Sequence, residues 1–540
     1  MKDASGAADS SLRMTADSTA GVSRYYVIAL VLVTLLAYFP VLGNDFVAYD
    51  DPYYLLENPL VNRGVTPEAI RDAFTTMAQG HWHPLTWVSH QIDFALFGVN
   101  PAGHHAMNLL FHVLNVLLLF RLLRRLNLAP QLAAITAGLF ALHPLHVESV
   151  AWASERKDVL CTFFMLLALI GYERYAREPR RGSYLGTLAF FAASLLAKSM
   201  SVTLPVLLLL LDWWPLRRLD RQRLARVLAE KVPFFLLSGV ASVMAFLAQK
   251  TSGATAMGVD PGVAMNLANA VRSVALYLVK TVWPAGLAPL YLFPAEIPAG
   301  QIVGAILVLL GLLALAVIQR NRNPWITFGI LWYLVTLLPI IGIVHVGFQA
   351  LADRYTYIPH IGVFLAVVAA AEKWIGSRRG AATVVVSAVL LGLAAATYAQ
   401  ARLWRNSETL FRAAIARTSG NYVMMHNLGD ELLRQGRIAE GVKQHELAAA
   451  LRPDDPECQF SYGSALLQSG EFSGAEAHLR QALALGPSRK TTGRIYNNLG
   501  SALWNMGRKQ EALATFYQAL QFAPKSRTVR KNIEDLKREM

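Results

Sequence analysis

Long apolar runs alternate with short polar loops over the first 400 residues, and polar amphipathic segments follow them. Because a membrane-spanning helix needs about 20 mostly apolar residues, the runs predict eleven spans. They are residues 25–43, 105–123, 131–151, 158–176, 183–199, 202–216, 232–249, 300–318, 325–344, 355–374 and 381–400. The pattern therefore predicts an all-α fold, in which a polytopic membrane helix bundle precedes a helical C-terminal domain.

Residues 266–283 differ from these runs because they are amphipathic and include Arg272 and Lys280. An amphipathic helix of this kind is typical of the membrane interface. If it were counted as a span, Arg320 and Arg322 would lie on the opposite side from the other basic loops. We therefore interpret residues 266–283 as an interfacial or re-entrant helix.

Basic residues gather in alternate loops, and such loops lie on the cytoplasmic side of a membrane. The clusters are Arg121/Arg124/Arg125, Arg174/Arg177/Arg180/Arg181, Arg217/Arg218/Arg221/Arg223/Arg226, Arg320/Arg322 and Lys373/Arg378/Arg379. This predicts a cytoplasmic N-terminus, and the odd number of spans places the C-terminal domain outside. Residues 1–23 are small and polar, which is typical of a disordered cytoplasmic lead. We expect the first run to be an anchor, since no cleavage site follows it.

Composition agrees with a membrane protein, since 54% of the residues are hydrophobic and only 16% are charged. The net charge of +14 could indicate a nucleic-acid partner, but the basic cytoplasmic loops account for it, so we expect none. Cys161 and Cys458 fall in different predicted domains, which argues against a disulfide framework and against a cysteine metal site.

The C-terminal domain repeats a pattern of about 34 residues, the period of the tetratricopeptide repeat. Glycines 429, 463 and 500 open three similar units, and prolines 453, 487 and 524 end them. The units cover 421–453, 454–487 and 488–524, and the third carries a short insertion near 488–492. Such repeats form a concave surface that usually binds a protein segment.

Asp50 and Asp51 follow the first span almost directly, in a long loop with helix-like pieces at 67–78 and 84–97. Carboxylates at a membrane face are costly without a function or a partner. One could act as a general base toward an acceptor hydroxyl while the other is anchored. The alternative is a loop turn that caps the following helical segment.

A second outward loop contains His143, His146 and Glu148. Two histidines three residues apart with a nearby carboxylate could bind a divalent cation, although Pro144 disfavours helix at His143. Binding of a phosphate head group, or capping at the end of the third span, are the alternatives.

Several cations are candidates for binding an anionic leaving group such as a lipid phosphate. They are Arg156, Lys157, Lys198, Lys280 and Arg354. The alternative for such residues at span ends is snorkelling toward the interface.

Three segments resemble the TMTC group of membrane O-mannosyltransferases, and so do Lys280-Thr281-Val282-Trp283-Pro284 and the repeats. The three segments are residues 45–51, 143–160 and 352–359. The resemblance implies a GT-C glycosyltransferase domain over 24–401 and a repeat domain over 402–540, with bacterial relatives closest in pattern. A bacterial inner-membrane location follows from it.

The resemblance also implies a function: inverting transfer of a mannose-type sugar from a polyprenyl-phosphate carrier to a Ser or Thr hydroxyl. Asp50 and Asp51 inherit the catalytic role, and His143, His146 and Glu148 inherit a place in the cavity. The protein acceptor would bind the repeats. A lipid-linked polysaccharide ligase or polymerase, and a non-enzymatic repeat scaffold in the membrane, remain as alternatives.

Overall fold

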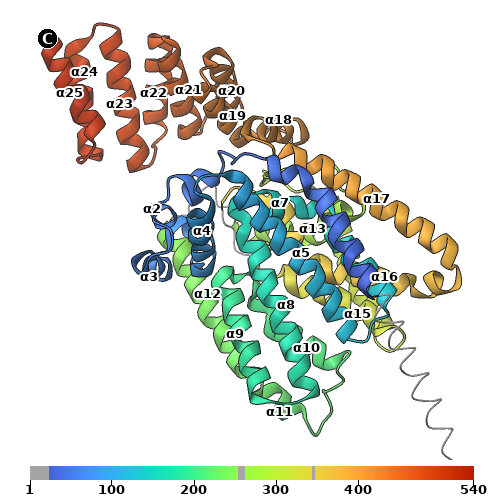
Figure 1. The fold of residues 1–540 in the computed structure, drawn as a ribbon. Coiled ribbons are helices and arrows are strands. Elements are labelled where there is room, and N and C mark those ends of the chain that lie inside the picture. The colour runs from blue at the N-terminus through green and yellow to red at the C-terminus, as the bar shows by residue number, and fades with distance from the viewer. Residues whose placement is uncertain (1–22, 253–261, 343–346) are drawn as a thin grey trace, which may run out of the picture. The chain divides into compact units, whose positions relative to one another are not determined.

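The computed structural model describes residues 23–252, 262–342 and 347–540, and the chain divides into two compact units, Met1–Asn406 and Ser407–Met540. All but the last residue of the predicted lead, 1–23, lie outside the described residues. Both units are built from helices, as predicted (Figure 1). The described parts contain one small antiparallel sheet, in which β1 (Tyr291–Leu292) pairs with β2 (Gln349–Leu351).

Among the described residues of the first unit, eight helical segments are long and apolar enough to cross a membrane, which makes the chain a multi-pass membrane protein. They are Ser23–Gly43, Pro101–Arg125 (α5), Ala153–Arg177 (η5 and α8), Leu224–Thr251 (α11 and most of α12), Gly262–Val282 (α13), Ala299–Gln319 (α14), Pro359–Ser377 (α16) and Arg379–Leu403 (α17). Seven of them coincide with predicted spans.

The other four predicted spans form α6 (Pro130–Leu142), α9 (Arg181–Ala197), α10 (Leu204–Trp213) and α15 (Pro324–Leu337). Three of these helices are shorter than the sequence suggested, and the fourth, α9, has the predicted 17 residues. The prediction of one continuous helix over 131–151 is wrong. Pro144 disfavours the helical conformation of the residue before it, and His143 is extended there, with ψ at 128°. The chain continues as two short helices, η4 (Pro144–His146) and α7 (Val147–Ala151).

Helix α13 meets the criteria for a span by length and composition, although its sequence predicted an interfacial helix. It packs beside α14 and on α15, where the hydroxyl of Tyr333 donates to the carbonyl of Val274, and it also contacts loops and the end of a neighbouring helix. Asn269 donates to the backbone carbonyl of Ala350, and Arg272 donates to Gln301 in the first turn of α14. Near its other end, the carbonyl of Thr281 accepts from His143.

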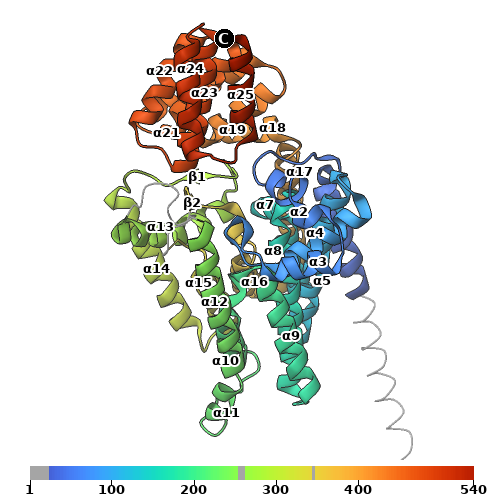
Figure 2. The same cartoon turned by 90° about the vertical axis from the view of Figure 1, so that its left-hand side faces the viewer.

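Helices of the first unit pack in antiparallel pairs that follow the chain. Helix α8 (Arg156–Arg177) lies between α5 and α9, and α12 (Val232–Ser252) continues this row beside α9 (Figures 1 and 2). Helices α15 and α16 approach each other most closely at Gly329 and Gly362. A Cβ atom at Gly329 would press on the carbonyl of Gly362 and lie 2.8 Å from Cβ of Ala366. Both positions therefore need glycine for close packing.

The variant Gly329→Leu should force α15 and α16 apart. Overpacking of this kind costs about 1–3 kcal/mol, so we expect a lower melting temperature of the purified protein in detergent. Gly311→Leu in α14 is the matched control, since nothing lies within 4 Å of its Cβ position. Equal melting of both variants would contradict the close approach.

The second unit is a stack of helix pairs, as the repeat pattern predicted (Figure 1). After α18 (Ser407–Arg417) come α19 (Tyr422–Arg434), α20 (Ile438–Leu451), α21 (Pro456–Ser469), α22 (Phe472–Ala484), α23 (Arg489–Asn505), α24 (Lys509–Phe522) and α25 (Arg527–Glu539). Each first helix of a repeat carries a glycine against the second helix. Gly463, for example, faces Leu479, and Gly500 faces Phe516.

Candidate active site

The first loop folds into a layer of short helices that holds Asp50 and Asp51 in place. Both predicted helical pieces are present, as α3 (Pro67–Thr75) and α4 (Pro84–Phe97). Each begins with proline, whose fixed φ and missing N–H suit the first helical position. The buried Gln91 of α4 donates to one carbonyl of α2 (Pro59–Asn62) and to one of α3. The layer is thus cross-linked by its own polar groups.

Asp51 is a buried anchor between two loops that are distant in the sequence. One carboxylate oxygen accepts from the backbone N–H of Val47 at 2.9 Å, and the other accepts from the N–H of Ser154 at 3.0 Å. Burial raises the pKa of Asp51 to about 7, against the lowering effect of these two hydrogen bonds. Asp51 therefore ties the first loop to the start of α8 and has no free oxygen to offer a substrate.

Replacing Asp51 by asparagine should destabilise the protein, because the amide group can accept through only one oxygen. One of the two backbone N–H groups would lose its partner, at a cost of about 1–3 kcal/mol. We expect a lower melting temperature in detergent, while Asp72→Asn on α3, which weakens a half-exposed ion pair with Arg63 at 3.1 Å, should change it little because such pairs contribute about 0–1 kcal/mol. A stable Asp51→Asn protein would show that this anchor is dispensable.

Asp50 has a different environment from its neighbour. Its carboxylate makes no hydrogen bond or ion pair with any residue in the part of the chain that the structure describes. Burial raises its pKa, and the charge of Glu155 adds to this, whereas Lys157 and Arg354 lower it. Asp50 is thus a partly buried base that faces two cations without being bound to either.

Arg354 is held beside this carboxylate by Glu148. Its backbone N–H donates to one oxygen of Glu148 at 2.9 Å, and its guanidinium donates to the other oxygen. The guanidinium Nε also lies 3.4 Å from Glu155, and the group stacks over the ring of Trp152 at 5.6 Å. Although burial lowers the pKa of Arg354, the two carboxylates raise it well above its ordinary value. Arg354 is therefore a fixed positive charge.

Lys157 and Lys198 both pair with carboxylates at the start of α8. The ammonium group of Lys157 lies 2.9 Å from Glu155 and donates to the carbonyl of Ser154 at 3.0 Å. Lys198, which follows α9, lies 3.4 Å from Glu155 and 2.5 Å from Asp158. Glu155 is thus shared by both lysines and by Arg354.

Ion pairs join six of these residues, and Asp50 lies within the electrostatic influence of the group. We call all seven the loop cluster: Asp50, Glu148, Glu155, Lys157, Asp158, Lys198 and Arg354. Three of its carboxylates are paired with its three cations, which leaves Asp50 as the additional negative charge. Burying a charge costs several kcal/mol unless the charge is paired. Every member of the loop cluster except Asp50 has such a partner. A buried carboxylate without a partner is a candidate functional group.

Aromatic rings surround the loop cluster. The ring of Tyr49 stacks on Trp152 with centroids 5.2 Å apart, and the ammonium group of Lys157 lies 4.7 Å from the ring centre of Tyr54. The rings of Tyr54 and Trp152 are themselves buried, and they exclude water from the charged groups that they flank.

Lys280 reaches the edge of the loop cluster through a chain of hydrogen bonds. It donates to the hydroxyl of Tyr291 at 3.0 Å, and Tyr291 donates to Asp353 at 2.9 Å. Burial raises the pKa of Asp353 to about 6 although Lys280 lowers it. Asp353 precedes Arg354, so Lys280 supports the segment that carries this arginine.

His143 and His146 belong to a separate histidine cluster. His143 donates to the carbonyl of Thr281 at 2.9 Å. The carbonyl of Phe140 can only accept, so Nδ1 of His146 carries the proton and its Nε2 accepts from His360 at 2.9 Å. Glu148 instead binds Arg354, so these groups do not converge on one point. The structure therefore offers no support for a cation shared by His143, His146 and Glu148.

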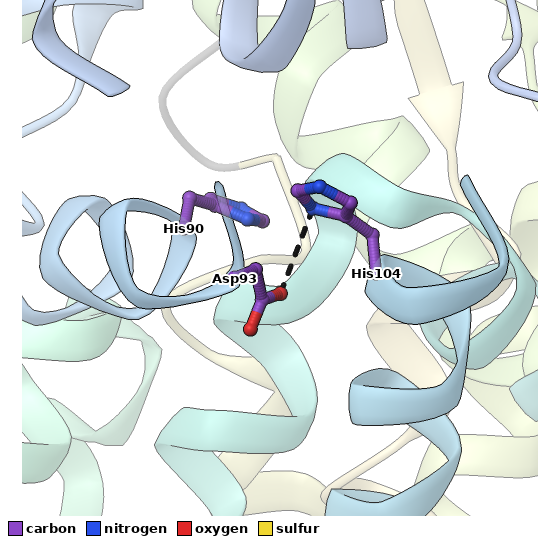
Figure 3. Close-up of side chains that lie close together, drawn as sticks. All are labelled: His90, Asp93 and His104. Carbon is purple, nitrogen blue, oxygen red and sulfur yellow. Dashed lines mark ion pairs between the residues drawn. The ribbon is translucent and has the colours of Figure 1, made fainter. Parts of the chain in front are cut away.

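Arg156 lies in another buried network, away from the loop cluster. Its guanidinium pairs with Asp93 at 2.6 Å and donates to Ser89, to Asn108 and to the carbonyl of His104. Asp93 and His90 of α4 face His104 of α5 here (Figure 3). The side chain of Arg156 is fully buried. We therefore replace its expected phosphate-binding role with a structural one, the joining of α4, α5 and α8.

Four residues of the site were not expected from the sequence: Glu155, Asp158, Tyr54 and Trp152. Glu155 and Asp158 stand in the run Glu-Arg-Lys-Asp, whose alternating signs signal ion pairs. The sequence could not show that three cations share Glu155. Lys157, Lys198 and Arg354 belong to distant segments of the chain, and only the fold brings them together.

Two protein-family models match the chain. The first, dolichyl-phosphate-mannose-protein mannosyltransferase, matches residues 84–246, which include most of the loop cluster. The second, a tetratricopeptide repeat, matches residues 426–490 and 463–527 and confirms the predicted repeats.

Curated relatives cover more of the chain. Human protein O-mannosyl-transferase TMTC1 is 26% identical over 77% of this chain and 54% of its own length. Mouse TMTC4 is 24% identical over 67% of this chain and 57% of its own length, and Drosophila melanogaster Tmtc2 is 34% identical over 36% and 22%. The chain thus spans about half the length of the first two. Together with the two family models, these relatives show that the chain is similar to TMTC-type protein O-mannosyl-transferases over most of its length.

Proposed function

We propose that the protein is an integral membrane hexosyltransferase that moves a mannose-type sugar from a polyprenyl-phosphate carrier to a Ser or Thr hydroxyl. The observation that carries this proposal is the environment of Asp50. Its carboxylate is partly buried, lacks a bonding partner among the described residues, and faces Lys157 and Arg354. A free base beside two fixed cations suits a reaction in which a proton is removed and an anion leaves.

In the proposed reaction, Asp50 takes the proton of the acceptor hydroxyl as its oxygen attacks the anomeric carbon of the sugar. The new glycosidic C–O bond forms while the bond from this carbon to the phosphate oxygen breaks. The carrier phosphate leaves with the bonding electrons, and the configuration at the anomeric carbon inverts. Asp51 does not touch the reactants; it positions Asp50 through the anchored turn.

Arg354 and Lys157 are the residues that we assign to the leaving phosphate. Both keep unused N–H groups within the described structure, since Arg354 donates to one carboxylate and Lys157 to one carboxylate and one carbonyl. The arginine fork suits two phosphate oxygens. Lys198 pairs with Asp158 and Glu155 and positions these carboxylates without contacting the phosphate. Lys280 supports Asp353 through the hydroxyl of Tyr291.

We further propose that the loop cluster faces the non-cytoplasmic side of a bacterial inner membrane. An interfacial α13 would keep Arg320 and Arg322 on the same side as the other basic loops, and it would leave eleven crossings and a cytoplasmic N-terminus. The repeat unit would then be non-cytoplasmic and would hold the protein acceptor, as helical repeats hold peptide segments.

The test is sugar transfer by the purified protein in proteoliposomes. The sugar donor is polyprenyl-phosphate mannose with a radiolabelled sugar, and the acceptor is envelope protein of the expression host. We expect label on protein that β-elimination releases, as it does for sugars on Ser or Thr. Label on glycan would replace the proposal with a ligase or polymerase, and absence of label would favour a scaffold or another carrier-linked sugar.

The pH profile of transfer should reflect the raised pKa of Asp50. A general base works only when deprotonated, so the rate should fall as the pH drops through this pKa, above the ordinary value of 3.8. Lys157 lowers the pKa of Asp50 and Glu155 raises it. Lys157→Met should therefore move the inflection to higher pH and Glu155→Gln to lower pH. Identical inflections in all three proteins would exclude Asp50 as the titrating base.

A further inference from the structure

The first repeat of the second unit contains a cluster of two histidines and one aspartate that the other two repeats lack at the equivalent positions. His426 and Asp430 lie one turn apart on α19, and His445 faces them from α20. We propose that these three residues form a site for a zinc-class divalent metal ion. This proposal is independent of the glycosyltransferase function.

The geometry suits a tetrahedral ion. Nε2 of His426 lies 3.3 Å from one oxygen of Asp430, and Nε2 of His445 lies 3.2 Å from the other. One ligand atom from each residue lies within 4.8 Å of the other two. Zinc binds nitrogen and oxygen at about 2.0–2.2 Å, so its tetrahedral ligands lie roughly 3.3–3.6 Å apart. Small rotations of the side chains would place all three at bonding distance.

His445 supplies the second, independent observation. Its side chain is 1% exposed; Nδ1 has no hydrogen-bond partner among the described residues, and Nε2 makes no well-directed hydrogen bond although it lies 3.2 Å from Asp430. A buried polar group without a partner costs about 1–3 kcal/mol and calls for an explanation such as an ion or water that the structure does not contain. The ring nitrogen faces Asp430, where the metal would sit.

Comparison within the chain shows that the fold does not need a histidine here. His445 packs on Gly429, and the equivalent contacts in the next two repeats are Leu479 on Gly463 and Phe516 on Gly500. An apolar side chain thus fills this position in the other two repeats. At the position of Asp430, the steps of 34 and 37 residues between the repeats lead to Ser464 and Ser501.

The metal would have an open side. His426 and Asp430 line a cavity of about 530 Å³ together with Glu457, Phe460 and Arg494. Three protein ligands and one open position are typical of zinc sites that exchange a water or bind an external ligand. The fourth ligand would be water or a donor atom of the segment that occupies this cavity.

One other group of described residues, His90, Asp93 and His104, has a similar set of ligand types (Figure 3). There the buried Arg156 already neutralises Asp93 at 2.6 Å. A divalent ion would add to that positive charge in a buried place, which is unfavourable. In contrast, no cation lies within ion-pairing distance of Asp430 among the described residues, apart from the two histidines themselves.

The test uses the full-length protein in detergent, stripped with a chelator and titrated with Zn²⁺ against a chromophoric competitor. His445→Leu is the main variant, because repeat two has leucine at this position and the fold should be kept. Asp430→Ser is the second variant. His478→Gln in repeat two, where His478 contacts Gln459, is the matched control.

We expect the wild-type protein and the control to bind one equivalent of Zn²⁺ that both test variants lose, with affinity reduced more than about 100-fold. Partners outside the ligand shell already contribute about 10- to 100-fold at metal sites. Zn²⁺ should also raise the melting temperature of the wild-type protein but not that of His445→Leu. Equal Zn²⁺ affinity of the wild type and both variants would overturn the proposal.

Discussion

The variant Asp50→Asn is expected to lose sugar transfer while it keeps its fold and its binding of the lipid-linked sugar. Removing a positioned base lowers a rate by about 10²- to 10⁴-fold. The loss should appear in kcat rather than in KM, because Asp50 contacts the reacting proton and not the carrier phosphate. The folded state should persist, since the carboxylate has no partner within the described residues to lose. Steady-state transfer in proteoliposomes and melting in detergent measure the two effects.

Asp45→Asn is the matched control for this variant. Asp45 precedes Asp50 in the same loop, and its side chain is exposed. It should keep the transfer rate of the wild-type protein. If Asp45→Asn and Asp50→Asn had equal rates, Asp50 would not be the base, and the loop cluster would be a structural ion-pair network.

The second large effect is expected for Arg156→Met, and it is an effect on folding. Removing one partner of a buried ion pair leaves an uncompensated charge, which costs about 3–5 kcal/mol. Here Asp93 would lose its cation in the fully buried contact between α4, α5 and α8. We expect a large decrease in melting temperature and in the yield of folded protein. Activity should fall only in proportion to the folded fraction.

A double variant separates this structural role from phosphate binding. In Arg156→Met/Asp93→Leu both buried charges are absent, and replacing a buried pair by apolar side chains is often tolerated. We expect the double variant to recover stability and transfer per folded molecule. If it were stable but inactive, with a raised KM for the lipid-linked sugar, Arg156 would be a phosphate ligand and its structural assignment would be wrong.

Hydrophobic runs predicted much of the membrane unit, because a span depends on local composition. The limits of this signal are seen at 131–151. The run is apolar enough for one helix, but Pro144 and the extended backbone at His143 divide it. The helix ends there, and η4 and α7 carry Glu148 toward Arg354. Composition could not show that the apolar residues after His143 pack in a loop region.

The same difference between local and distant information applies to the site. Asp50 and Arg354 could be selected from the sequence because charged residues next to membrane spans are costly unless they have a function or a partner. Their separate roles could not be predicted, because Asp51 is anchored by Ser154, more than 100 residues away. Arg156 and Lys157 are adjacent in sequence, yet on the first turn of α8 they point to different networks. Which of two neighbours faces a cavity depends on helix rotation, and the sequence alone does not fix that.

The initial rates of mannose transfer by Asp50→Asn and by Asp51→Asn distinguish the proposed base from its anchor. Both variants are assayed in the same proteoliposomes, and each rate is divided by the amount of folded protein. The account predicts a loss of about 100-fold or more for Asp50→Asn and a rate within about tenfold of wild type for folded Asp51→Asn, which only positions Asp50. Full activity of Asp50→Asn, or the larger loss in Asp51→Asn, would contradict it.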